Sequence, residues 1–173
     1  MNPFSWSFRE QFLLGATVSL GLIVVAITMG GVLGLEACPL CIFQRVAFGA
    51  LGLMFLLGAL FAPSGRTGRG VWSLAAFAAA CVGIGIAGRH VWLQLFPGEA
   101  ATCGLPLSFM RETMDTPGLL RQLYNQAMNA RGDCALVDWS FLGLSMPAWS
   151  LVWFVLLGAW ALFAGFHGRR RKN

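Results

Sequence analysis

The chain of 173 residues contains five cysteines, and their spacing sorts them into two pairs and one single residue. Cys38 and Cys41 form a C-x-x-C motif, while Cys103 and Cys134 share a later segment with 30 residues between them. Cys81 stands alone in an apolar stretch, where a cysteine usually behaves as a small hydrophobic residue, so we assign it no role. The two pairs are therefore the candidates for chemistry.

Three interpretations of the two pairs are open: structural disulfides, a metal site and thiol–disulfide exchange. A disulfide within C-x-x-C closes a very small ring and would staple little of the chain, and such motifs are more often redox-active or metal-binding. A four-thiolate zinc site usually contains a second closely spaced pair, which this sequence lacks, so we assign no metal ligands. The spacing favours exchange, in which one dithiol passes electrons to the other.

The residues around the C-x-x-C motif indicate how a thiolate would be stabilised. Pro39 suits the first position of a helix, so Cys38 would be the N-cap and Cys41 would lie in the first turn. The positive end of the helix dipole favours a thiolate there. Arg45 follows one turn later on the same face, about 6 Å deeper in a membrane. We expect it to support the Cys41 thiolate and to donate to a carbonyl group between them; the alternative is an arginine that reaches back to the headgroups.

Further polar residues fall close to the same site. Gln44 precedes Arg45 and offers a polar contact. His90, with Arg89, ends the third apolar stretch, and the pair is either an interfacial anchor or a cation or proton donor beside the cysteines. Four aromatic residues near this surface are more typical of an interfacial belt than of a cofactor stack. They are Trp92, Phe96, Trp139 and Trp149.

Motifs that are missing from the sequence reduce the number of possible electron acceptors. No G-x-G-x-x-G follows a predicted strand, and no C-x-x-C-H motif for haem is present, so nothing indicates a bound nucleotide or haem. A lipid-soluble acceptor could reach Cys41 and Arg45 from the bilayer. A quinone fits this chemistry, because its carbonyl oxygens accept hydrogen bonds from arginine and its ring can be attacked by a thiolate.

The composition identifies the elements that must position these residues. Hydrophobic residues make up 57% of the chain and charged residues only 11%, against about 25% charged residues in a typical soluble domain. A disordered chain, an ordinary soluble globule and a small secreted disulfide scaffold are excluded. Four uncharged stretches reach the length of about 20 residues that a membrane span needs. The sequence predicts an all-α, four-transmembrane-helix bundle that forms one membrane domain over residues 1–173, with helices at about 12–35, 43–63, 70–92 and 147–167.

The basic residues predict the direction of the four spans. Arg9, Arg66, Arg69 and the basic run at 169–172 mark the two termini and the second connection as cytoplasmic. The two remaining loops, at about 36–42 and 93–146, would then be extracytoplasmic, where cysteines meet an oxidising compartment. The basic run is a membrane anchor in this interpretation, so no nucleic-acid partner is expected despite a net charge of +5.

The long loop contains a stretch with apolar residues at a roughly helical period, from residue 105 to residue 130. Two short amphipathic helices on the membrane surface would fit, separated at Pro117 and Gly118. A partly ordered loop is the alternative.

Taken together, these motifs resemble the DsbB family of bacterial inner-membrane disulfide-bond oxidases. The similar segments are Cys-Pro-Leu-Cys-Ile-Phe-Gln-Arg at 38–45, His-Val-Trp-Leu-Gln-Leu-Phe-Pro at 90–97, Ala-Thr-Cys at 101–103, Gly-Asp-Cys at 132–134 and Phe-Leu-Gly-Leu-Ser-Met-Pro-Ala-Trp at 141–149. The similarity covers essentially the whole chain. The Pro-Leu pair between the first two cysteines is a departure that could tune the potential of that pair.

The resemblance implies a role for each outer cysteine. Cys103 is similar to the cysteine that forms a mixed disulfide with a reduced DsbA-like, thioredoxin-fold protein of the periplasm, and Cys134 is its partner. Electrons would pass to the first pair through an interloop disulfide between Cys134 and Cys38. Cys41 is similar to the cysteine that reacts with the quinone, either ubiquinone or menaquinone.

The resemblance also implies which polar residues serve the quinone. Arg45 is similar to the arginine that supports the quinone step, and His90 matches a histidine near the quinone site. Gln44 joins them as a candidate binding residue.

The sequence thus predicts an enzyme, a quinone-dependent thiol oxidase of the bacterial inner membrane, with both termini cytoplasmic and the cysteine pairs facing the periplasm. It would reoxidise a DsbA-type dithiol oxidase and sustain disulfide formation. Two alternatives remain open: a membrane thiol reductase or partner-specific paralogue, and a non-enzymatic four-helix scaffold with structural disulfides or zinc. Arg45 argues against the scaffold, which has no need of an arginine at that depth.

Overall fold

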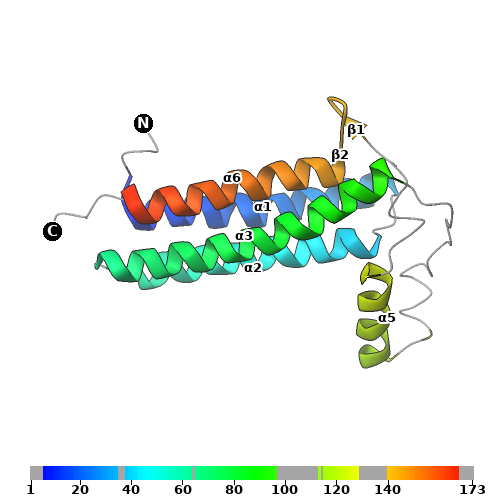
Figure 1. Cartoon of the computed structure of the whole chain (residues 1–173), viewed down its shortest axis with the longest axis horizontal. Coiled ribbons are helices and arrows are strands. Elements are labelled where there is room, and N and C mark those ends of the chain that lie inside the picture. The colour runs from blue at the N-terminus through cyan, green and yellow to red at the C-terminus, as the bar shows by residue number, and fades with distance from the viewer. Residues whose placement is uncertain are drawn as a thin grey trace.

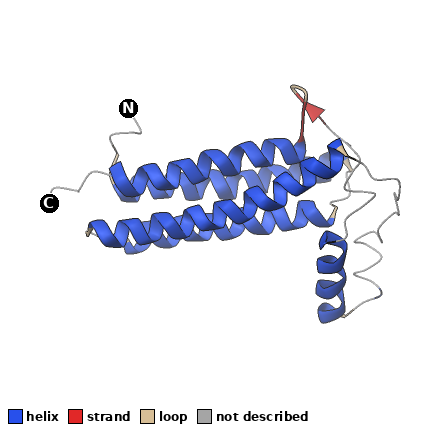
Figure 2. Cartoon of the chain, in the orientation of Figure 1, coloured by secondary structure: helices blue, strands red, loops and turns tan. Residues whose placement is uncertain are grey.

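The structure is a computed structural model that describes residues 6–34, 38–63, 65–96, 113, 115–128 and 140–167. Cys103, Cys134 and Trp139 lie outside these residues. Within these residues the secondary-structure elements are helices and one short hairpin, whose arrangement is shown in Figures 1 and 2. They are α1 (Phe8–Leu33), α2 (Pro39–Phe61), α3 (Arg66–Leu95), α5 (Thr116–Met128), β1 (Ser140–Phe141), β2 (Leu144–Ser145) and α6 (Met146–His167).

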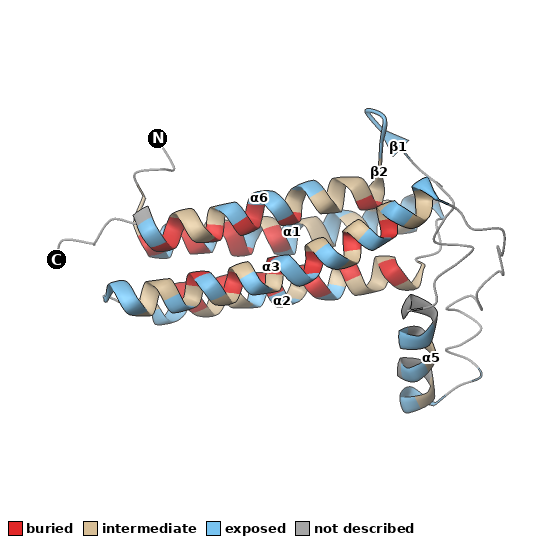
Figure 3. Ribbon diagram, viewed as in Figure 1, coloured by how far each residue is buried: buried red, intermediate tan, exposed pale blue. Residues whose placement is uncertain are grey.

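Four of the helices, α1, α2, α3 and α6, lie side by side and are each long and apolar enough to cross a membrane. Their inward faces carry the buried residues and their outward faces the exposed ones (Figure 3). Phe12, Phe55 and Phe154 are fully buried in the centre, whereas Val32, on the outside, is 84% exposed. Large apolar side chains on the outer surface suit contact with lipid rather than with water. The prediction of a four-helix membrane bundle is confirmed.

The helices extend beyond the predicted bounds at several ends. Helix α1 begins at Phe8 instead of about 12, because Ser7 and Glu10 form a capping box. Helix α2 begins at Pro39 with Cys38 as its N-cap, which confirms the prediction from the C-x-x-C motif and places the start ahead of the span bound of about 43. The predicted bounds marked the apolar part of each span, but backbone hydrogen bonds continue where the chain leaves the hydrocarbon.

Helix α3 differs most from its prediction, since it spans Arg66–Leu95 rather than about 70–92. Arg66 and Arg69 were expected in the turn between two spans, yet they form the first turn of this helix, and the connection is confined to residues 62–65. The helix has 30 residues, which corresponds to about 45 Å at 1.5 Å per residue. That length exceeds a hydrocarbon core of about 30 Å, so both helix ends reach the interfacial region.

The most extensive contacts are those of α3 with α6 and of α1 with α2. Contacts between α2 and α3 join these two pairs. A Cβ atom on Gly83 would overlap the ring of Phe154, so the glycine lets α6 approach α3 closely. The Phe154 ring in turn stacks on Phe48 of α2, with centroids 3.9 Å apart. One aromatic residue of α6 therefore holds two neighbouring helices together.

The two remaining elements lie at one end of the bundle. Helix α5 contacts α2 at that end and extends sideways from the bundle rather than along it (Figure 1). The break expected at Pro117 and Gly118 lies slightly earlier, because Asp115 is not helical while both of these residues lie in the first turn of α5, where proline costs no hydrogen bond. The part of the predicted stretch before Thr113 lies outside the described residues. The hairpin was not predicted. Its turn, Leu142 and Gly143, has φ values of 54° and 80°, which glycine adopts readily and leucine rarely.

The ends of the helices separate into two groups. The start of α1, the end of α6 and the connection of α2 to α3 lie at one end of the bundle (Figure 1). The start of α2, the end of α3, the hairpin and α5 lie at the other. The C-x-x-C motif is therefore remote from the ends of the helices that carry the two termini.

Candidate redox site

The first turn of α2 is built around the C-x-x-C motif. Cys38 is the N-cap, with extended backbone (φ −64°, ψ 158°), and Pro39 occupies the first helical position. The Cys38 Sγ atom accepts a hydrogen bond from the backbone N–H of Cys41 at 3.3 Å. The Sγ atoms of Cys38 and Cys41 lie 2.9 Å apart. The start of the helix thus aims both sulfurs at one another and surrounds them with N–H dipoles that favour negative charge.

His90 of α3 lies next to this turn and is only 2% exposed. Its Nε2 atom lies 3.8 Å from Cys38 Sγ, and its Nδ1 atom lies 3.0 Å from Nε2 of Gln44. Gln44 is itself 5% exposed. With the amide nitrogen donating to Nδ1, the proton of a neutral imidazole is on Nε2, facing the Cys38 sulfur.

A small apolar cluster fixes the position of the histidine. Leu40 of α2 is 3% exposed and packs with Phe43, Ile86 and Leu93 against Cys38. Ile86 lies four residues before His90 and Leu93 three residues after it, so the three side chains share one face of α3. The same packing that docks α3 on the start of α2 therefore carries the imidazole to the thiols.

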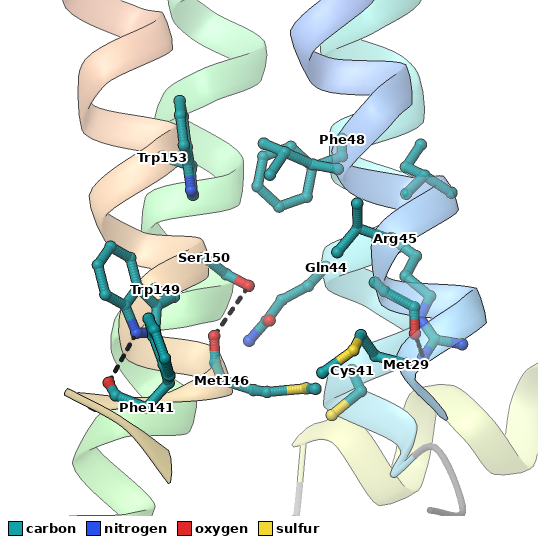
Figure 4. A pocket seen from close by; sticks show the side chains of 14 residues that line it. Met29, Cys41, Gln44, Arg45, Phe48, Phe141, Met146, Trp149, Ser150 and Trp153 are labelled. Atoms are coloured by element: carbon teal, nitrogen blue, oxygen red, sulfur yellow. Dashed lines mark hydrogen bonds between the residues drawn. The ribbon is translucent and has the colours of Figure 1, made fainter. Parts of the chain in front are cut away.

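Arg45 lies one turn after Cys41, as its spacing predicts. Its Nη2 atom donates a hydrogen bond to the backbone oxygen of Ala26 in α1, at 3.0 Å. The guanidinium is therefore anchored across the α1–α2 interface within the bundle. Cys41 and Arg45 lie on the wall of one cavity (Figure 4).

That cavity has a volume of about 330 Å³, within the range of small-molecule pockets. Residues of α1 and α2 line one side, and residues of α6 face them (Figure 4). The walls are mainly apolar and aromatic. The lining residues are Leu22, Ile23, Val25, Ala26, Met29, Cys41, Gln44, Arg45, Phe48, Phe141, Met146, Trp149, Ser150 and Trp153.

Comparison with known proteins bears on this site. The model of the family described as disulfide bond formation protein DsbB matches residues 8–164. The chain belongs to the DsbB family. The Disulfide bond formation protein B of Xanthomonas euvesicatoria pv. vesicatoria (strain 85-10) is 54% identical over 171 residues, covering 98% of this chain and 97% of the relative. The protein of that name from Xylella fastidiosa (strain 9a5c) is 46% identical over 173 residues, covering 99% of this chain and 98% of the relative.

Membership of the DsbB family assigns the chain to disulfide bond formation, as an oxidoreductase embedded in a membrane. The resemblance inferred from the motifs is confirmed. Within this DsbB-family chain, the structure brings together four predicted site residues around one helix turn: Cys38, Cys41, Gln44 and His90. Arg45 lies on the adjoining cavity wall, and Cys103 and Cys134 are outside the described residues.

Several residues of the cavity were not singled out in the sequence. Trp149 was expected in an interfacial belt, yet it lines the cavity, and its Nε1 donates to the backbone oxygen of Phe141 at 3.1 Å. The sequence does contain a pattern that relates the cavity residues, namely their helical spacing. Each helix contributes a stripe at i, i+3, i+4 and i+7: 22, 25, 26 and 29 in α1, 41, 44, 45 and 48 in α2, and 146, 149, 150 and 153 in α6. The period alone does not say which stripes face one another.

The other residues considered from the sequence lie on the exposed surface, away from the redox site of this DsbB-family chain. Arg89 is exposed although its neighbour His90 is buried, so the two do not act as one pair. Cys81 is exposed on the outer side of α3. Trp92 and Phe96 are exposed at the end of α3, with ring centroids 4.5 Å apart.

Proposed function

We propose that this protein reoxidises a periplasmic DsbA-type dithiol protein and passes the electrons to a membrane quinone. One observation carries the proposal: Cys41, one thiol of the C-x-x-C pair, opens onto an apolar cavity that also presents Arg45. Val25, which helps to line that cavity, is 56% exposed on α1. A lipid-soluble acceptor can therefore approach the thiol from the bilayer, without crossing water.

The lining of the cavity suits a quinone head group. Phe48, Trp149 and Trp153 offer aromatic walls for a flat ring, and the methionine side chains adapt to its substituents. Arg45 bears the polar hydrogens that a carbonyl oxygen accepts, whereas the Ser150 hydroxyl donates to the backbone oxygen of Met146 at 3.2 Å. Ubiquinone and menaquinone share this ring and carbonyl chemistry, so the proposal includes both.

The exchange steps balance in sulfur, electrons and protons. A thiolate of the partner attacks Cys103 in a Cys103–Cys134 disulfide, and the second partner thiol then displaces Cys103, which leaves the partner oxidised. The Cys134 thiolate next attacks Cys38 in a Cys38–Cys41 disulfide and frees Cys41 as a thiolate. Cys103 then attacks Cys134 and releases Cys38. Two electrons and two protons pass from the reduced Cys38–Cys41 pair to the quinone, which becomes a quinol.

His90 and Gln44 support the step at Cys38. The imidazole Nε2 faces the Cys38 sulfur, so it can hold or deliver the proton that this thiol gains and loses. Gln44 holds the opposite ring nitrogen and so sets the direction in which the ring points. Arg45 acts on the other side of the pair, at the cavity.

The orientation in the membrane forms part of the proposal. The C-x-x-C motif, α5 and the hairpin share one end of the bundle, and the basic residues Arg9, Arg66 and Arg69 share the other. We place the cysteine end in the periplasm of a bacterial inner membrane and both termini in the cytoplasm. The scaffold alternative is disfavoured by membership in a disulfide-forming family.

The test is reduction of quinone by the purified protein in detergent, fed with a reduced DsbA-type protein. Loss of quinone absorbance is followed separately with ubiquinone and with menaquinone. We expect turnover that disappears in Cys103→Ser and persists in the matched control Cys81→Ala. Folded protein that turns over neither quinone would contradict the proposal, and net reduction of the partner's disulfide would indicate the reductase alternative.

A further inference from the structure

Two thiols and one imidazole converge at the start of α2. The donor atoms of Cys38, Cys41 and His90 all lie within 4.8 Å of one another. We infer that this trio, when the dithiol is reduced, binds a thiophilic divalent cation such as Zn²⁺. The site differs from the four-cysteine arrangement considered from the sequence, because its third ligand is a histidine from another helix and both outer-loop cysteines are dispensable.

One of the ligand distances matches a tetrahedral site, and the distances to Cys41 require its side chain to move. Zinc bonds of about 2.3 Å to sulfur and about 2.0–2.1 Å to nitrogen separate neighbouring ligand atoms by about 3.4–3.8 Å. The 3.8 Å between Cys38 Sγ and His90 Nε2 already fits. The sulfurs, 2.9 Å apart, would have to separate by about 0.9 Å to match. Binding therefore requires the half-buried Cys41 side chain to rotate, so that its sulfur moves away from Cys38 Sγ and stays near the His90 ring, which is now within 4.8 Å.

The charge at the site is also suitable. Binding converts two thiols to thiolates and releases two protons to solvent, so the bound ion and its sulfurs carry no net charge. A neutral complex suits a half-buried position at the membrane surface better than two unpaired thiolates do. The N–H of Cys41, which already donates to Cys38 Sγ, adds further stabilisation to the sulfur charge.

Gln44 supplies the outer support that histidine ligands need. A metal-bound imidazole is usually held by a hydrogen bond to its other ring nitrogen. Here Nε2 points to the sulfurs and Nδ1 faces the Gln44 amide at 3.0 Å. The amide carries a donor and an acceptor, so rotation about its terminal bond presents its oxygen to Nδ1–H when Nε2 binds the ion.

Zinc binding would depend on the redox state of the protein. Three protein ligands leave a fourth position for water or an added thiol. A Cys38–Cys41 disulfide offers no thiolates, so only the reduced protein binds. Once bound, the ion holds both sulfurs and prevents their reoxidation. This inhibitory consequence rests on the proposed function, whereas the binding itself does not.

The binding test uses the full-length protein in detergent, with Cys103→Ser and Cys134→Ser combined so that the outer loop contributes no thiols. The protein is reduced with a phosphine and titrated with Co²⁺, whose visible bands report tetrahedral thiolate coordination, and Zn²⁺ is then added to displace it. We expect one ion per chain, and the same result after adding the control Cys81→Ala. Reduced, folded protein that binds no Co²⁺ and no Zn²⁺ overturns the inference.

Further variants test the ligand set. We expect His90→Gln and Gln44→Leu each to weaken Zn²⁺ binding by about tenfold or more. Unchanged affinity and spectrum in folded His90→Gln would remove the histidine from the site. If that variant does not fold, the wild-type protein still decides: binding by its disulfide form, or by protein alkylated at both thiols, contradicts the inference.

A parallel quinone assay separates this inference from the proposed function. Zn²⁺ should inhibit turnover, and a chelator should restore it. Stoichiometric Zn²⁺ binding by protein that reduces no quinone would contradict the proposed function alone. Zinc-insensitive turnover by protein that binds no metal would contradict the inference alone.

Discussion

His90 Nδ1 lies 3.0 Å from Gln44 Nε2, in a buried contact that joins α3 to α2 beside the cysteine pair. Both side chains are almost fully enclosed. A polar contact in such a place is costly to break, since a buried group that loses its partner destabilises the fold by about 1–3 kcal/mol. The pair therefore has two effects, docking the helices and directing the imidazole toward Cys38.

The first prediction concerns this contact. Gln44→Leu should lower the melting temperature of the protein in detergent and slow the reaction of reduced Cys38 with a thiol reagent, with an altered pH profile, because the ring loses a fixed orientation. Gln44→Glu keeps the side-chain length but replaces the donor by acceptors, so the contact requires a proton on Nδ1 of His90, and the pH profile should differ from that of wild type. A pH profile that is identical in wild type and Gln44→Leu would reduce Gln44 to a packing residue.

Cys41→Ser should abolish quinone reduction while leaving the first exchange step intact. The reason is that Cys41 is the thiol on the cavity wall, whereas Cys103 is proposed to meet the partner. Quinone absorbance measures the first effect, and a non-reducing gel of the mixed disulfide with the partner protein measures the second. Normal quinone turnover in this variant would remove Cys41 from its proposed role.

Arg45→Met should raise the quinone concentration required for half-maximal rate by about tenfold, as expected for loss of a hydrogen bond from a charged donor. The variant also loses the bond to the Ala26 carbonyl. Arg45→Lys retains a charged donor and should show a smaller effect. If the quinone titration of Arg45→Met matches wild type, the arginine serves only as an anchor between α1 and α2.

Filling the cavity should weaken quinone use without touching either cysteine pair. Ser150 lines the cavity from α6, so Ser150→Phe should raise the quinone requirement while mixed-disulfide formation with the partner continues. The matched control is Val152→Phe, since Val152 is 38% exposed and does not line the cavity. Equal quinone titrations for the two variants would place the acceptor elsewhere.

Gly83→Ala should destabilise the bundle by about 1–3 kcal/mol, because its Cβ would overlap the ring of Phe154 and force α6 away from α3. Gly85→Ala is the control on the same helix, since nothing lies within 4 Å of that position. Thermal unfolding in detergent compares the two variants. Equal melting temperatures would show that α3 and α6 adjust without cost.

Much of the fold could be predicted from the sequence, because a segment that crosses lipid must be apolar, helical and long enough to span the hydrocarbon core. Uncharged stretches of sufficient length become spans, and Pro39 sets the N-cap at Cys38. The exact ends of the spans did not follow, since hydropathy marks the edge of the hydrocarbon while the helix of Arg66–Leu95 continues past it. The hairpin was missed because Leu142 occupies a left-handed turn position that usually holds asparagine or glycine.

The site was predicted unevenly for a related reason. Cys38, Cys41 and Arg45 are neighbours along one helix, so spacing alone relates them. His90 is 52 residues from Cys38, and only the docking of α3 on α2 brings its ring to the sulfur. The α6 wall of the cavity, including Trp149 and Ser150, likewise depends on which helix faces which. Contacts between distant segments are set by packing, which a local pattern does not encode.

The N-cap of α2 has a mechanical consequence. In the proposed mechanism Cys38 Sγ forms and breaks bonds, and the same atom accepts a hydrogen bond from the N–H of Cys41. A bond that draws this sulfur toward another atom should therefore loosen the first turn of the helix. Loss of an N-cap destabilises a helix by about 1 kcal/mol, which is enough to change the population of a frayed first turn several-fold. Cys41 sits in that turn, at the edge of the cavity. The fraying of the first turn of α2, and with it the mobility of Cys41, should therefore change each time the sulfur bonds rearrange.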